Sequence, residues 1–399
     1  MRRSWHFIGM DVHAGSSELA SVSERGQLLS RWSGPTAIPR LLEAIEAVPR
    51  YRSLAFEEGP LADWLLRNLT GHVDEIIVSD PARNALIAKD SDKDDPIDAE
   101  KLAQLLRGGY LRAVHHPESL ERLIFKQHVG LYQQQVCQRV HEANRVLAYL
   151  LRWGVFAKER DLVGEEARKE LRRQLPKEPT VQGDLSSLLA SYDTAAEQHR
   201  EMRKRLVALG RKEPQIRRWI ELPGVSWIRA ATVFAYLDTP WRFRSKEALW
   251  RYMGIGLGHH GSGGGPMRVR VSPQANRRLK CAILGAAKTA IASKDNPFAE
   301  QHEVWIHEEI SPRNARRNVA RSLAAVMWGM WKNGSEYRPE WVGRPGVELA
   351  KEGLEGRAAR RLGGGSGVPP RTIGPRRKEE SPQPVNEPAA PVGYARRSS

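Results

Sequence analysis

Short strand-like and helix-like blocks alternate through the first 115 residues, and their order constrains the fold of this chain more than any other feature. Three strand-like blocks come first, and the turn-prone Glu24-Arg25-Gly26 between the second and the third predicts a meander. Apolar residues at helical spacing follow, and strands and helices then alternate. The predicted strands are residues 5–12, 19–22, 28–32, 53–56 and 76–78, and the predicted helices are 38–48, 64–69 and 97–106.

Four acidic residues lie at strand ends or at a helix start, and the predicted order of strands and helices can bring these ends together. Asp11 ends the first strand, Glu57 follows the fourth, and Asp95 and Asp98 lie three apart at a helix start, where both carboxylates leave one face. The order βββαβαβα is that of an RNase H-like fold, a mixed sheet with helices. Converging carboxylates repel one another unless cations separate them, and such hard oxygen ligands suit Mg²⁺ or Mn²⁺. Two such ions would activate and clamp the oxygens of a phosphoryl transfer.

A purely structural role stays open for the two aspartates. Asp95 and Asp98 also suit a helix cap and a first-turn acid, with Asp90, Asp92 and Asp94 as solvated neighbours. Spacing alone does not separate this interpretation from a metal site.

Two long amphipathic helices are predicted in the middle of the chain. Apolar residues recur at spacings of three and four from Leu120 to Leu150, and again from Leu185 to Leu206 after a charged, proline-containing loop. Two such helices in succession indicate an antiparallel hairpin or a coiled coil, whose apolar faces serve as core or as a dimer contact.

The composition shifts again from about residue 214. Eight of the twelve tryptophans lie from Trp219 onward, interleaved with arginines, and this mixture offers phosphate contacts and stacking surfaces. The segment Glu221-Leu222-Pro223-Gly224-Val225 separates two helical runs, the second being 228–237, and this arrangement is similar to a helix-hairpin-helix element. Helices are expected again over 276–333. Beyond Trp341 the Gly-, Pro- and Arg-rich composition predicts a disordered basic tail.

Ser262 lies in the glycine-rich stretch Gly261-Ser262-Gly263-Gly264-Gly265. Bare backbone lets a large substrate approach closely, so the serine hydroxyl would be exposed for nucleophilic attack. An ordinary flexible linker explains the same residues, and this alternative stays open. The stretch has neither a GxSxG elbow nor a Walker lysine, which argues against a hydrolase triad and against ATP use. Neither His115-His116 nor His259-His260 has the spacing of a metal site.

Charge and cysteine content indicate the class of partner and the compartment. Lys and Arg number 63 against 47 Asp and Glu, and the net charge of +16 favours a polyanionic partner, nucleic acid before an anionic membrane surface. No apolar run approaches the roughly 18 residues of a membrane span. Cys137 and Cys281 are too few for a disulfide framework or a four-ligand zinc site, which fits a reducing cytoplasm.

Several motifs together resemble the insertion sequence 110 family of DEDD transposases. The N-terminal acidic motifs are Gly9-Met10-Asp11-Val12-His13, Phe56-Glu57-Glu58-Gly59-Pro60 and Lys93-Asp94-Asp95-Pro96-Ile97-Asp98-Ala99. The C-terminal motifs are Glu221-Leu222-Pro223-Gly224-Val225, Tyr252-Met253-Gly254-Ile255, and Gly261-Ser262-Gly263 through Val271-Ser272 and Asn276. They occur in the family's order over roughly residues 5–335, and together they are more specific than any one of them.

The resemblance implies a site and a reaction. It implies that Asp11, Glu57, Asp95 and Asp98 bind Mg²⁺ in an RNase H-like, Holliday-resolvase-type domain, and that Ser262 attacks DNA to form a phosphoserine link before strand exchange. It further implies double-stranded DNA as substrate, a structured guide RNA, a homo-oligomer (dimer or tetramer) that completes a composite site, and a bacterial, nucleoid-associated location. Glu58 stands beside Glu57, and Ser272 is a second hydroxyl, so each leaves an alternative to the preferred residue.

The domain division and the function follow from these observations as expectations. We expect an RNase H-like domain over 1–115, a coiled-coil helical hairpin over 116–212, a mainly helical C-terminal transposase domain over 213–340 and the tail over 341–399. The expected function is that of a site-specific DNA transposase or recombinase. Two alternatives are a metal-dependent junction resolvase or nuclease in which Ser262 is only a linker, and a non-catalytic nucleic-acid-binding protein.

Overall fold

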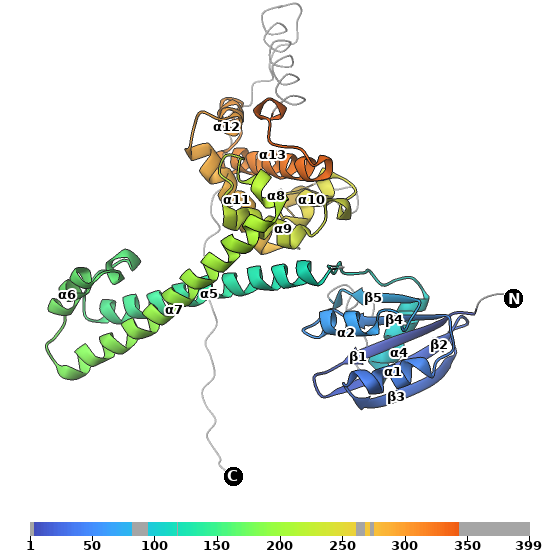
Figure 1. Ribbon diagram of the computed structural model, residues 1–399. Coiled ribbons are helices and arrows are strands. Elements are labelled where there is room, and N and C mark those ends of the chain that lie inside the picture. The colour runs from blue at the N-terminus through green and yellow to red at the C-terminus, as the bar shows by residue number, and fades with distance from the viewer. Residues whose placement is uncertain (1–3, 82–94, 118, 261–267, 272–274, 343–399) are drawn as a thin grey trace, which may run out of the picture. The chain divides into compact units, whose positions relative to one another are not determined.

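A computed structural model describes residues 4–81, 95–117, 119–260, 268–271 and 275–342 (Figure 1). The strands are β1 His6–Val12, β2 Ser16–Ser23, β3 Leu28–Pro35, β4 Arg52–Glu57, β5 Glu75–Ser79, β6 Leu257–His260 and β7 Arg268–Val271. The α-helices are α1 Ile38–Glu46, α2 Ala62–Leu69, α4 Asp95–Arg107, α5 Leu120–Arg152, α6 Glu165–Arg173, α7 Pro179–Lys212, α8 Pro214–Trp219, α9 Trp227–Leu237, α10 Lys246–Tyr252, α11 Arg277–Ala292, α12 Pro297–His307 and α13 Pro312–Asn333. Short 3₁₀ helices are η1 Glu159–Leu162, η2 Pro240–Arg242 and η3 Pro339–Trp341. In these residues, no helix combines the length and the apolar character that a membrane crossing needs.

The N-terminal strands form one mixed sheet in the order β3-β2-β1-β4-β5 (Figure 1). β1, β2 and β3 are antiparallel, as the predicted meander requires, whereas β4 runs parallel to β1 and β5 parallel to β4. A mixed sheet followed by helices was expected from the order of the blocks, and this is confirmed. The RNase H-like assignment itself stays a prediction.

The two faces of the central strands differ in the size of their side chains. Ile8 and Met10 of β1 belong to a buried cluster with residues of α1 and α2. On the other face the middle positions are small: Gly9 pairs with Ala55, and Ala55 is buried with Leu102 of α4. Side chains alternate between the faces of a strand, so one face carries the main core and the other accepts α4 at close range.

Gly9 allows this close approach. A Cβ at this position would overlap the carbonyl oxygen of Ala99 and lie 2.5 Å from the backbone nitrogen of Ala103. Both are backbone atoms of α4, so no side-chain rotation relieves the clash.

Replacing Gly9 by alanine is therefore expected to destabilise the N-terminal sheet by about 3 kcal/mol, the cost of overpacking a closely packed core. Urea denaturation followed by circular dichroism measures the loss. Gly15→Ala is the matched control, since a Cβ at Gly15 meets nothing within 4 Å. Equal midpoints for the two variants would contradict the packing of α4 on β1.

The two predicted long helices are confirmed as α5 and α7, and they run antiparallel (Figure 1). The hydroxyl of Tyr149, late in α5, donates to the carbonyl of Val181, early in α7. Tyr132 in turn lies 5.4 Å from His199, ring centre to ring centre. Sequence analysis did not predict α6 and η1, which cover the apolar residues at one end of the pair.

The C-terminal helices pack around an aromatic centre. Trp219 is fully buried, and its indole nitrogen donates to the carbonyl of Met327 in α13. Trp331 lies edge-on to Trp219 and stacks on Phe234 of α9. Many of the tryptophans from Trp219 onward therefore belong to the hydrophobic core or pack against it. The hairpin β6–β7 was not predicted, and the expected tail over 341–399 lies outside the described residues beyond Val342.

Candidate active site

The carboxyl ends of two neighbouring parallel strands place Asp11 beside Glu57. The register of β1 and β4 pairs Gly9 with Ala55 and Met10 with Phe56, and the next residues along the two strands are the two acids. Two positions separate Asp11 from Gly9 and Glu57 from Ala55. Both acids therefore lie on the face that α4 covers.

The helix α4 runs against the direction of β1. Its C-terminal part lies at the β2–β3 turn, where the Gln104 amide donates to the carbonyl of Gly26 at 2.8 Å. This turn lies beside the start of β1, because it follows Ser23, which pairs with His6. Ala99, one turn from the helix start, lies against Gly9. The first turn of α4, with Asp95 and Asp98, is thereby directed toward the end of β1 that carries Asp11.

The four predicted acids therefore come from element ends that the fold brings to one edge of the sheet, but the described side chains among them do not form a closed cluster. Asp11 lies 3.3 Å from His13, and Asp98 is 46% exposed with Lys101 at 3.9 Å. Within the described side chains, no three Asp, Glu, His or Cys residues are close enough to hold a metal ion. The side chain of Asp95 is not among them. Carboxylate oxygens on a partly exposed edge fit a hydrated Mg²⁺, which keeps several waters.

Of the two adjacent glutamates, Glu58 forms a hydrogen bond with His116. Its Nε2 lies 2.6 Å from an oxygen of Glu58, and its Nδ1 lies 2.7 Å from an oxygen of Asp63. Carboxylates only accept hydrogen bonds, so both ring nitrogens donate and the imidazole is charged. The hydrogen bond to Glu58 raises the pKa of His116 above 6.5; burial lowers it, and Asp63 raises it again. Because Glu58 already accepts a hydrogen bond from His116, Glu57 is the preferred candidate for the predicted metal ligand.

The charged His116 makes the stability of this corner depend on pH. A raised pKa contributes stability that is fully present below pH 6.5, and this contribution is lost as the pH rises through the folded-state value. His116→Gln is expected to lower the free energy of unfolding by about 1 kcal/mol near pH 6, since the two carboxylates are partly exposed, and by less near pH 8.

Urea midpoints at the two pH values measure this difference. The matched control is His72→Gln, because His72 pairs with the single carboxylate of Glu46 on the surface. A His116→Gln effect that is the same at both pH values would contradict the charged bridge.

His115 and His116 each pair with an acidic side chain, and neither pair was predicted from the sequence. His115 Nε2 lies 2.7 Å from Asp238, which also accepts from Arg122. Burial alone would raise the pKa of Asp238, but these hydrogen bonds lower it. The acidic partners of the two histidines are 53 to 123 residues away in sequence, so no local spacing signals either pair.

The predicted nucleophile falls in the connection between β6 and β7. Ser262 and the second candidate, Ser272, lie outside the described residues, but the flanks of this hairpin are well anchored. Arg321 of α13 donates to the carbonyl of Ile255 at 2.7 Å, and the backbone nitrogen of Asn276 donates to the carbonyl of Tyr252 at 3.0 Å. The fold thus brings the motif at residues 252–255 to the motif that ends at Asn276.

The turn between α8 and α9 serves close packing. Gly224 has a φ of +78°, and a Cβ there would overlap the carbonyl oxygen of Ala286 in α11. Arg229 donates to the Gly224 carbonyl at 2.7 Å, and Ser226 caps α9. The two helices around this turn were expected, and their likeness to a helix-hairpin-helix element stays a prediction.

An arginine row follows the first turns of α13: Arg313, Arg316, Arg317 and Arg321. Residues three or four apart share one side of a helix, so these cations are neighbours. Burial lowers the pKa of Arg317, and the charges of Arg313 and Arg316 lower it further. Mutual repulsion of this kind is relieved when a polyanion binds.

Comparisons with known proteins fall on the same part of the chain. Residues 217–303 match the model of the transposase IS116/IS110/IS902 family. The resemblance to the insertion sequence 110 family is confirmed. The matched segment contains the Gly224 turn, the hairpin and Asn276. The chain is also 24% identical over 251 residues to "Putative transposase y4pF/y4sB" of Sinorhizobium fredii (strain NBRC 101917 / NGR234), covering 62% of this chain and 64% of that relative.

The segment that matches the family model does not include the N-terminal acids. Asp11, Glu57, Asp95 and Asp98 all precede residue 217, so their roles rest on the sheet edge and on the acidic motifs. The assignment of these acids and of Ser262 therefore remains a prediction.

Proposed function

We propose that this protein is a DNA transposase or recombinase of an insertion sequence that cleaves and rejoins strands by phosphoryl transfer. One observation carries the proposal. A segment that matches a transposase family is joined, in one chain, to a sheet edge where Asp11 and Glu57 end neighbouring parallel strands opposite the start of α4. Strand ends and helix starts are the usual positions of groups that act on phosphates.

In the proposed reaction the Ser262 hydroxyl attacks a DNA phosphorus. A phosphorus–oxygen bond to the serine forms, the bond from phosphorus to a deoxyribose oxygen breaks, and that oxygen takes up a proton. Mg²⁺, when bound, supplies Lewis-acid polarisation of the scissile phosphate. Asp11, Glu57, Asp95 and Asp98 would hold it, with Mn²⁺ as a substitute. Attack on the same phosphorus by a deoxyribose hydroxyl of another strand would break the bond to the serine oxygen, which takes up the proton, and complete the exchange.

The partners follow from charge and from the family. The arginine row and the net charge of +16 suit the phosphates of double-stranded DNA and of a structured guide RNA. The acids and the serine lie in different segments of the chain, so a homo-oligomer that brings a serine of one copy to the acids of another is part of the proposal.

A covalent adduct tests the function. Purified protein is incubated with Mg²⁺, the transcript that flanks the gene and DNA that carries the element ends, then denatured and separated on a gel. A protease-sensitive shift of the labelled strand is expected. Mg²⁺-dependent cutting without an adduct would favour the nuclease alternative, and binding without cutting would favour the non-catalytic one.

A further inference from the structure

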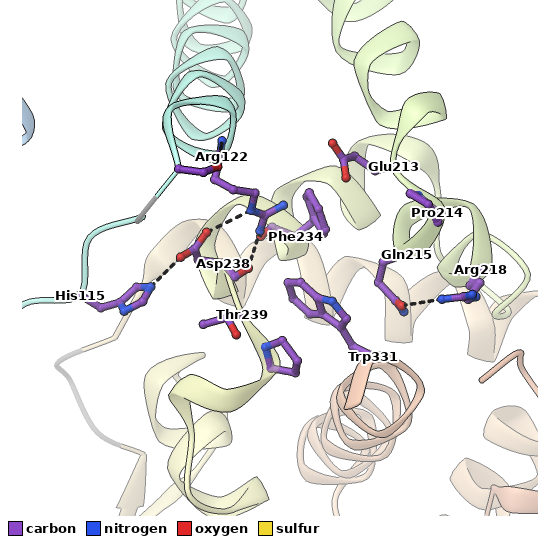
Figure 2. A pocket seen from close by; sticks show the side chains of 12 residues that line it. His115, Arg122, Glu213, Pro214, Gln215, Arg218, Phe234, Asp238, Thr239 and Trp331 are labelled. Carbon is purple, nitrogen blue, oxygen red and sulfur yellow. Dashed lines mark hydrogen bonds and ion pairs between the residues drawn. The ribbon is translucent and has the colours of Figure 1, made fainter. Parts of the chain in front are cut away.

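A cavity of about 570 Å³ opens among the helices of the transposase segment and its neighbours (Figure 2). It lies between the start of α5, the α7–α8 junction, the end of α9 and α13. Among the described residues, its lining includes none from the acidic edge or from β6 and β7, so the proposed chemistry leaves it unexplained.

Two of the residues that line this cavity each have a buried donor atom without an acceptor among the described residues. Gln215 is only 4% exposed, and its Oε1 accepts from Arg218 at 3.5 Å, which leaves Nε2 as the free donor. Within the described part of the chain, neither Nε2 of Gln215 nor Nη1 of Arg122 has a hydrogen-bond partner, although both are buried. The remaining nitrogens of Arg122 donate to Asp238 and to the Phe234 carbonyl. Buried N–H groups without acceptors oppose folding, so a site of this kind favours a ligand that supplies them.

The charged and aromatic side chains that line the cavity indicate the class of ligand. Arg122 and Arg218 are offset by Glu213 and Asp238, so the cavity has no excess of positive charge to favour a phosphate. Its apolar wall includes the ring of Trp331, which stacks on Phe234 (Figure 2). A flat, neutral molecule with carbonyl and N–H edges matches such a lining, and a nucleobase has these properties.

An exposed tryptophan stands next to the cavity wall. Pro240 lines the cavity, and the following residue, Trp241, is 71% exposed. The ammonium group of Lys332 lies 5.3 Å from the centre of the Trp241 ring and 3.8 Å from that of Trp328. A large exposed ring beside a cation is a stacking surface for an unpaired base next to a phosphate.

We propose that this cavity receives one unpaired nucleobase of the bound nucleic acid, with Gln215 donating to an acceptor on its edge and Trp241 stacking on the adjacent base. Nε2 has no exposed surface in this structure, so binding requires the Gln215 amide to rotate toward the base and release Arg218. The inference rests on the proposed function, since it presupposes that the chain binds nucleic acid. It concerns recognition of an extruded base, whereas the acids and Ser262 concern cleavage.

The test compares two labelled duplexes of one sequence, one fully paired and one with a single unpaired nucleotide, each made as DNA and as RNA. The full-length protein is expected to bind the bulged form about ten-fold more tightly at equal salt. Gln215→Leu and Trp241→Ala are each expected to reduce this ratio toward one. If only the DNA duplexes or only the RNA duplexes show the preference for the bulged form, that result identifies the nucleic acid to which the bound base belongs.

Gln301→Leu is the matched control, because Gln301 is a buried glutamine with an unpartnered amide oxygen in α12, away from the cavity lining. It is expected to keep the ten-fold ratio, and thermal unfolding checks that all variants fold. A ratio of one in the unaltered protein, with firm binding to the paired duplex, overturns this inference and leaves the proposed function standing. Retention of the ratio by folded Gln215→Leu also overturns it. Absence of binding to every duplex counts against nucleic-acid binding itself, and the inference fails with it.

Discussion

Replacing Asp11 by asparagine is expected to reduce Mg²⁺-dependent strand cleavage by about a thousand-fold or more. Asparagine keeps the size of the side chain but removes the charge that, in the proposed mechanism, would hold a divalent cation. Lewis-acid stabilisation of the transition state contributes several kcal/mol, and about 4 kcal/mol corresponds to this factor in rate. Single-turnover cleavage of labelled element-end DNA, measured over a range of Mg²⁺ concentrations, provides the test.

The control for this loss is Asp184→Asn, which removes the same charge from an exposed position in α7. It is expected to cleave at the rate of the unaltered protein. The neighbouring pair of glutamates adds a sharper comparison. Glu57→Gln is expected to match the Asp11 variant, and Glu58→Gln to lose far less, because Glu58 already accepts from His116. Full strand exchange by Asp11→Asn would remove the metal assignment at the sheet edge.

Replacing Ser262 by alanine is expected to abolish the covalent protein–DNA adduct completely. The proposed link is a phosphoester of this hydroxyl, and alanine has no oxygen to form it. Ser272→Ala is the control, since Ser272 is the other hydroxyl close to this stretch in sequence, and it is expected to keep the adduct. Gel separation after denaturation, with and without protease, distinguishes the two variants.

The outcomes for Ser262 separate the mechanisms. Loss of both adduct and exchange supports a serine nucleophile. Unchanged cutting by the alanine variant would mean that water is the nucleophile, with the acids acting alone as in a junction nuclease. Loss of the adduct in Ser272→Ala alone would move the nucleophile ten residues along the chain, past β7, without disturbing the proposed class of reaction.

The sheet edge was predictable from the sequence because it depends on local signals. Short apolar blocks and turn residues located the strands, and acids at the ends of the first and fourth strands were visible before any pairing was known. The parallel alignment of β1 with β4 then brought Asp11 beside Glu57. Strand limits moved by a few residues, since edge strands such as β3 extend into polar residues.

The His116 bridge, the β6–β7 hairpin and the cavity were not predictable from the sequence, because no local pattern of residues indicates them. The bridge from His116 to Glu58 and Asp63 joins residues more than fifty positions apart. The hairpin β6–β7 has short strands beside a glycine-rich stretch, so its alternation was too brief to recognise. The cavity beside Gln215 is built by helices from four parts of the chain, and no single stretch carries its pattern.

The unbroken helix α5 has a consequence for how the molecule tolerates insertions and deletions. Its early residues Phe125 and Val129 belong to the aromatic C-terminal core, and its late residues Val146 and Leu150 belong to a separate core with α7. Each helical residue turns the chain by about 100°, so one residue lost between the two cores would rotate one set of apolar side chains out of its core. A seven-residue insertion, matched in α7, would nearly restore the angle and only lengthen the pair. The relative rotation of the two cores about the helix axis is therefore constrained, whereas the distance between them is not. Natural length variation in this hairpin is expected in steps of about seven, eleven or eighteen residues, which keep the rotation within about 20° of a whole number of turns.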